Sequence, residues 1–76
     1  MNGLKVHITG VVQGVGFRPF VYNLAVSLNL KGWVKNTSAG VDIEVDGDKE
    51  TLDSFLQKLR YDAPPLSRID DFSASF

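Results

Sequence analysis

A chain of 76 residues is long enough for one domain and too short for two, and such a domain hides only about 60% of its unfolded surface. Hydrophobic residues make up 43% and charged residues 22%, which is typical of a soluble globular protein and excludes an intrinsically disordered one. The absence of cysteine excludes disulfides, thiolate metal sites and a cysteine nucleophile. A formal net charge of -1 gives no global attraction to nucleic acid or anionic membranes, so any anion site must be local.

The first elements are a strand, a glycine-rich loop and a helix. Apolar and polar residues alternate from Leu4 to Thr9, as they do in a strand with one buried face. Residues 10–16 break this pattern with glycines, which indicates a loop with unusual backbone angles. Pro19 suits the first helical position, and apolar residues then recur at helical spacing to about Asn29.

A hairpin follows the first helix. Gly32 reads as a helix stop signal, and residues 33–37 form a second strand. Residues 38–40 are a turn. Apolar and acidic residues alternate over 41–46, which predicts a third strand paired with the second.

The last elements are a helix and a strand. Asp48 is a candidate N-cap, and the apolar residues that follow have the spacing of an amphipathic helix, which Ala63-Pro64-Pro65 ends. The tail from Ile69 alternates weakly and predicts a fourth strand, with Ile69 out of phase with the others.

This order predicts an α+β fold, the ferredoxin-like plait (βαββαβ), in which an antiparallel sheet carries two helices on one face. Residues 1–76 then form one domain, without a repeat or interdomain linker. No signal segment or long apolar run is visible, so we expect a soluble, cytoplasmic protein without membrane contact.

The segment with the strongest chemical signal is 13–18, between the first strand and the first helix. Its glycines let successive N–H groups point into one concavity, the helix N-terminus adds partial positive charge, and Arg18 supplies a planar fork of donors. These features suit a phosphoryl group. The alternative is a tight turn with Arg18 solvated or paired with a carboxylate. The segment is not a Walker A loop, and the dinucleotide fingerprint is incomplete.

Two motifs resemble those of the acylphosphatase family. Gly10-Val-Val-Gln-Gly-Val-Gly-Phe-Arg18 is similar to the signature G-x-V-Q-G-V-x-[FY]-R, and Gly32-Trp-Val-Lys-Asn36 is similar to G-W-V-x-N. Pro19-Phe20 and the stretch 64–70 resemble a subgroup, the acylphosphatase-like N-terminal domain of the HypF carbamoyltransferases of hydrogenase maturation.

The resemblance implies hydrolysis of an acyl phosphate. In the maturation subgroup the substrate would be carbamoyl phosphate, used in carbamoyl transfer for the cyanide ligands of the NiFe site. Arg18 would hold the phosphoryl oxygens and Asn36 would orient the attacking water, with no metal and no cofactor. The expected phosphate-binding residues are Gln13, Gly14, Val15, Gly16, Phe17 and Arg18.

Two other functions are alternatives to this one. A non-catalytic module could bind carbamoyl phosphate for the remaining domains of a parent carbamoyltransferase. RNA binding is disfavoured because stacking aromatics and excess positive charge are missing. The acylphosphatase pattern T-x-F-x-I-R of a last strand is absent, so we expect a fragment of a longer chain with strand 33–37 at an exposed edge.

The remaining conspicuous residues have simpler interpretations. His7 is expected to be a surface histidine rather than a metal ligand. The acidic residues from Asp42 to Glu50 are expected to be solvated, and Arg68 lies either in a rigid connection or in a second contact site. The aromatic residues expected in the core are Trp33, Phe17, Phe20 and Phe55.

Overall fold

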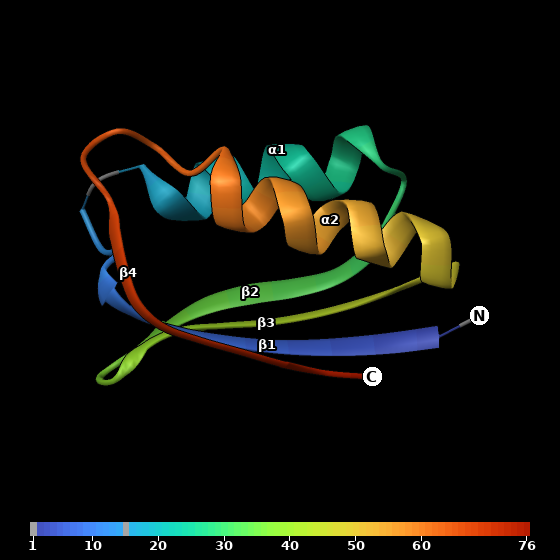
Figure 1. Ribbon diagram of the computed structural model, residues 1–76, viewed down its shortest axis with the longest axis horizontal. Coiled ribbons are helices and arrows are strands. Elements are labelled where there is room, and N and C mark those ends of the chain that lie inside the picture. The colour runs from blue at the N-terminus through green and yellow to red at the C-terminus, as the bar shows by residue number, and fades with distance from the viewer. Residues whose placement is uncertain (1, 15) are drawn as a thin grey trace.

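The structure, a computed structural model, describes residues 2–14 and 16–76, which form a four-stranded antiparallel sheet with two helices (Figure 1). The strands lie in the order β2-β3-β1-β4, and both helices cover the same face of the sheet (Figure 1). The predicted ferredoxin-like plait is therefore confirmed. In chain order the elements are β1 (Asn2–Val11), α1 (Phe17–Ser27), β2 (Lys31–Thr37), β3 (Gly40–Gly47), α2 (Lys49–Tyr61) and β4 (Arg68–Ser75).

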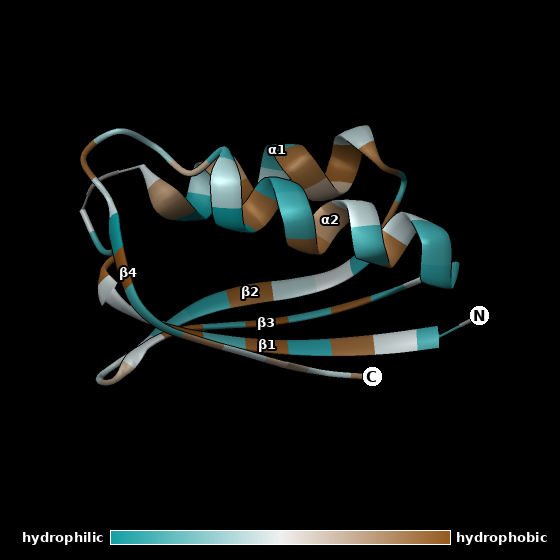
Figure 2. Cartoon of the chain, viewed as in Figure 1, coloured by the Kyte–Doolittle hydropathy of each residue, from teal (hydrophilic) through white to brown (hydrophobic). Residues whose placement is uncertain are grey.

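The central strand β1 carries the alternation that builds the core. Leu4, Val6 and Ile8 are buried, whereas the residues between them lie on the open face of the sheet, which we define as the face that carries no helix. Figure 2 shows the resulting bands of hydrophobic and hydrophilic residues along β1 and β3. The same period in β3 buries Val41, Ile43 and Val45, so the two central strands supply most of the sheet's share of the core.

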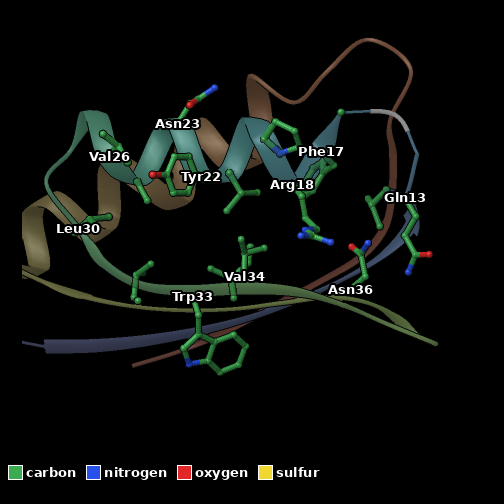
Figure 3. Close-up of a pocket in the computed structure, with 18 of the residues that line it drawn as sticks. Gln13, Phe17, Arg18, Tyr22, Asn23, Val26, Leu30, Trp33, Val34 and Asn36 are labelled. Atoms are coloured by element: carbon green, nitrogen blue, oxygen red, sulfur yellow. The ribbon is translucent and has the colours of Figure 1, made fainter.

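Pairing of β2 with β3 decides which side chains of β2 face the helices. Val34 pairs with the buried Ile43, so Trp33 and its partner Glu44 lie on the opposite face. Trp33 is 48% exposed, and its indole extends from the side of the sheet away from the helices (Figure 3). The expectation that Trp33 belongs to the core is wrong, because the strand's register outweighs the size of a single apolar side chain.

Helix α1 begins two residues before the expected position. Gly16 is its N-cap, with φ 82° in the left-handed region, so Pro19 occupies the third helical position rather than the first. Proline is tolerated throughout the first turn, where an N–H has no intrahelical partner. The helix ends before Asn29, whose φ is 57°, and Gly32 lies inside β2. The residue that ends the helix in a left-handed conformation is therefore Asn29, not Gly32.

Helix α2 places its apolar stripe on the sheet. Leu52, Phe55 and Leu59 are all 0% exposed, which confirms the predicted amphipathic helix. Asp48 occupies the N-cap position, as expected, but its side chain makes no capping hydrogen bond. Tyr61 ends the helix, and a turn closed by the bond from Ser67 N–H to the carbonyl of Pro64, 2.9 Å, leads to β4.

A β-bulge in β4 explains the mismatched phase of Ile69. Thr9 pairs with Asp71 and Gly10 pairs with Ile69, so Asp70 is one extra residue without a partner on β1. The extra residue lets Ile69 and Phe72 both pack against the core although they are three positions apart. The fully or nearly fully buried core consists of Leu4, Val6, Ile8, Val12, Phe17, Val21, Leu30, Val41, Ile43, Val45, Leu52, Phe55 and Leu59.

Candidate active site

The loop between β1 and α1 is held at both ends by buried side chains. Val12 and Phe17 are each 1% exposed and belong to the core, whereas Gln13, Gly14 and Gly16 are exposed. Gln13, Gly14 and Gly16 therefore lie at the surface between two buried anchors. Val15, a predicted phosphate-binding residue, lies outside the described residues.

Left-handed backbone conformations give the loop its curvature. Gly14 has φ 71° and Gly16 has φ 82°, and a Cβ added at either glycine would meet nothing within 4 Å. These positions need glycine for its backbone angles and not for lack of space. Residues in this conformation next to right-handed ones turn successive N–H groups toward one side, which is the geometry of an anion-binding nest.

The described amides of the loop make no hydrogen bond within the described backbone. The first backbone hydrogen bond of α1 runs from the N–H of Phe20 to the carbonyl of Gly16, 3.1 Å. Within the described part of the chain, no backbone hydrogen bond uses the N–H of Gln13, Gly14 or residues 16–18 as its donor. These amides sit at the N-terminus of an 11-residue helix, where the helix dipole also favours an anion.

Arg18 projects from the first turn of α1 over a groove between that helix and β2. The side chain is exposed, and none of the ion pairs among residues 2–14 and 16–76 involves it. The alternative of a carboxylate partner for Arg18 is therefore not supported. Arg18 is also the only charged side chain among the described residues that line the groove, so the local charge is positive although the whole chain carries -1.

Asn36 lies across the groove from Arg18. It is on the helix-facing side of β2, in phase with Val34, and it lines the same groove as the loop and Arg18. Figure 3 shows the guanidinium of Arg18 and the side-chain amide of Asn36 pointing toward one another. The groove, about 740 Å³ in volume, thus brings together every described residue of the predicted site, namely Gln13, Gly14, Gly16, Phe17, Arg18 and Asn36.

The rest of the groove was not anticipated from the sequence. Tyr22 and Val26 extend it along α1, are 64% and 56% exposed, and lie one and two helical turns beyond Arg18. The spacing i, i+4, i+8 was the signal that places them on the same face of the helix. Together with Leu30 and Val34 they make the groove apolar away from its charged end.

Other conspicuous residues lie outside the groove. His7 is half-buried on the open face and its Nδ1 contacts the carboxylate of Asp42 on the neighbouring strand, so it is less exposed than expected. Arg68 donates two hydrogen bonds to Asp70, 3.0 and 3.3 Å, which favours the rigid connection over a second anion site. Among the residues described, no group of three histidine, aspartate or glutamate side chains could hold a metal ion.

Comparison with known proteins decides the family. The family model for acylphosphatase matches residues 4–76. The chain belongs to the acylphosphatase family. An acylphosphatase of Bacillus pumilus is 46% identical over 65 residues, which cover 84% of this chain and 71% of that protein. The carbamoyltransferase HypF2 of Cupriavidus necator is 56% identical over 68 residues, which cover 90% of this chain and 8% of that protein.

Solved structures give the same two groups of relatives. A full-length HypF in its phosphate- and nucleotide-bound form matches with a TM-score of 0.93 at 44% identity, over 96% of this chain and 10% of that one. An acylphosphatase from Bacillus subtilis matches with a TM-score of 0.92 at 37% identity, over 99% of this chain and 83% of that one. The chain therefore spans about a tenth of the length of the carbamoyltransferases it resembles and most of the length of the free acylphosphatases. No described helix is long and apolar enough to cross a membrane.

Proposed function

We propose that this chain is an acyl phosphate phosphohydrolase domain, with carbamoyl phosphate as its substrate. The observation that carries the proposal is that one groove is lined by the glycine-rich loop, by Arg18, which has no ion-pair partner among the described residues, and by Asn36, which points toward Arg18 (Figure 3). A phosphoryl group carries charge on three equatorial oxygens in the transition state and needs donors aimed at them. The loop and Arg18 supply such donors from a single short segment.

In this reaction a water oxygen attacks phosphorus, the bond from phosphorus to the acyl oxygen breaks, and the acyl carboxylate or carbamate leaves with the bonding electrons. Arg18 and the N–H groups of the loop hold the phosphoryl oxygens, and the side-chain amide of Asn36 orients the water. No described carboxylate or histidine lines the groove, so we assign the water's proton to a phosphoryl oxygen of the substrate. The leaving group departs as a stabilised anion, and no covalent intermediate with the protein is required.

The high identity to carbamoyltransferases supports a place for this domain in hydrogenase maturation. In this proposal the chain is a cytoplasmic N-terminal part of a longer carbamoyltransferase. Its partners are then the remaining domains, which receive the carbamoyl group for the NiFe-site cyanide ligands. The alternative is a module that binds carbamoyl phosphate without hydrolysing it, and the same loop would serve that role.

The decisive experiment measures phosphate release from carbamoyl phosphate and acetyl phosphate by the purified chain. Arg18→Ala is expected to lower kcat/KM by about 10²- to 10³-fold, the usual effect of removing a donor to a developing charge. Asn36→Ala is expected to lower kcat while phosphate affinity changes little, because Asn36 contacts the water rather than the phosphoryl group.

Arg68→Ala is the matched control, since Arg68 is an exposed arginine bonded to Asp70 and lies outside the groove. Its kcat/KM should equal that of the wild type. Saturable binding of carbamoyl phosphate without turnover would favour the binding module. Turnover that survives Arg18→Ala would overturn both versions of the site.

A further inference from the structure

The side chain of Gln13 joins the phosphate loop to the end of the β2–β3 hairpin. Its Nε2 donates one hydrogen bond to the carbonyl of Thr37, 2.7 Å, and another to the carbonyl of Gly40, 3.3 Å. Thr37 ends β2 and Gly40 begins β3, and the two residues form the pair next to the turn. One amide group therefore holds both strands of the hairpin next to the turn that joins them.

The hairpin end that receives these bonds is itself braced. The hydroxyl of Thr37 donates to the carbonyl of Gly40, 3.3 Å, and accepts a hydrogen bond from the N–H of Ala39, 3.2 Å. The carbonyl of Gly40 thus accepts from two side chains, and the turn is fixed from within. Asn36 immediately precedes Thr37, so a force on the carbonyl of Thr37 acts one residue from the amide that faces Arg18.

The two halves of the groove come from different parts of the fold. Arg18 and the amides belong to the loop and the start of α1, whereas Asn36 belongs to an edge strand that pairs only with β3. Among the side-chain hydrogen bonds between described residues, those of Gln13 are the only ones that join this loop to β2 and β3. Without them the relative position of the halves depends on the pairing of β1 and β2 with β3 and on apolar packing, neither of which acts on the loop itself at Gln13.

We propose that Gln13 is a positioning residue, whose side chain sets the place of the phosphate loop relative to Asn36. The inference rests on the proposed function, because the distance between the phosphate loop and Asn36 matters only if both contact the reacting groups. It gives Gln13 a second role beside the backbone amide donor expected from the sequence, because the side chain binds the hairpin and leaves the backbone N–H for the ligand. A misplacement of reacting groups by about 1 Å lowers a rate by up to about 100-fold, so a tether of this kind affects kcat.

The test uses Gln13→Met, which keeps the length of the side chain and removes both donors. We expect kcat for acyl phosphate hydrolysis to fall about 10- to 100-fold while KM stays near the wild-type value. Gln57→Met is the matched control, because Gln57 is an exposed glutamine on α2 outside the groove, and its kcat should not change.

A double-mutant cycle separates positioning from general stabilisation. Gln13→Met combined with Asn36→Ala should be about as slow as the slower single variant, because Gln13 acts through Asn36. Independent, multiplying losses in the double variant would overturn the inference. So would an unchanged kcat in Gln13→Met, or a lost kcat accompanied by an equal loss of phosphate affinity.

If the wild type shows no turnover, the proposed hydrolysis is wrong, but the positioning role of Gln13 can still be tested. The test is then a titration with inorganic phosphate, followed by the NMR chemical shifts of the amides. Inorganic phosphate should then shift the side-chain amide of Asn36 and the loop amides in the wild type. Gln13→Met should lose the Asn36 response and keep that of the loop. An Asn36 response that is unchanged by the substitution, or absent from both proteins, overturns the positioning role.

Discussion

At the scale of single residues, the site depends on two glycines that no other part of the fold requires to be small. The space around the Cβ positions of Gly14 and Gly16 is open, so substitution there changes backbone preference and little else. A left-handed conformation costs an L-residue about 1–2 kcal/mol, and asparagine tolerates it better than alanine. The effect of substitution therefore isolates the contribution of loop curvature to anion binding.

Gly16→Ala is expected to lower the free energy of unfolding by about 1 kcal/mol and to weaken phosphate binding, because alanine resists the φ of 82°. Gly16→Asn should lose less of both, since asparagine accepts this conformation more readily than alanine. Urea denaturation and phosphate titration check the order. Equal losses in the two variants would show that curvature at Gly16 does not matter.

The same scale shows what sequence reasoning could and could not find in the site. Arg18, Asn36 and the glycine loop were predictable because their residue types and order carry the chemistry directly. The role of the Gln13 side chain was not, since its acceptors are two backbone carbonyls, and a carbonyl leaves no mark in a sequence. The prediction that Trp33 lies in the core was wrong for a similar reason. The side of the sheet on which Trp33 lies depends on the pairing of Val34 with Ile43, which the sequence does not state.

At the scale of elements, the order and type of all six were predictable from hydrophobic period and turn residues. The boundaries were less so. Helix α1 begins at Phe17 because Gly16 adopts a left-handed conformation that starts the helix before the proline. In β4, Ile69 does not fit the alternation of apolar residues, because the strand contains a bulge. A period-two pattern does not allow for one extra residue in the strand.

Deletion of Asp70 is the prediction that tests the bulge. Removing the extra residue leaves Ile69, Asp71 and Phe72 consecutive, so a regular strand keeps Ile69 and Phe72 on the same face and in their present pairing with β1. The deletion is therefore expected to cost less than about 1 kcal/mol of the free energy of unfolding. Asp70→Ala is the control, since it keeps the backbone and removes only an exposed ion pair worth about 0–1 kcal/mol. Urea denaturation should find the deletion about as stable as the substitution; a deletion that is clearly less stable would show that the bulge does more than correct the phase of Ile69.

At the scale of the whole molecule, one layer of side chains between the sheet and two helices carries the stability. Domains of this size unfold with a free energy of about 5 kcal/mol or little more. The phosphate loop joins that layer directly, because Phe17 is buried between the exposed Gly16 and Arg18. A substitution that disturbs the core is therefore expected to disturb the phosphate loop as well.

Phe55→Ala tests how small the free energy of unfolding of this domain is. Phe55 is 0% exposed at the centre of α2, and truncation of a buried phenylalanine costs about 3–5 kcal/mol, most of the expected total. The variant should be largely unfolded by circular dichroism at 37 °C. Tyr61→Ala, at a 78% exposed position of the same helix, should change the free energy of unfolding by less than about 0.5 kcal/mol. A Phe55→Ala variant as stable as Tyr61→Ala would place the main core elsewhere.

The outward position of Trp33 determines what optical spectroscopy can see in this protein. It is the chain's single tryptophan, and the nitrogen of Lys35 lies 5.5 Å from the centre of its ring, on the side of the sheet that bears no helix. The emission of the indole therefore reports the hydration of that outer surface and not the packing of the interior. A molecule that covers the open face of the sheet would therefore change the emission of Trp33.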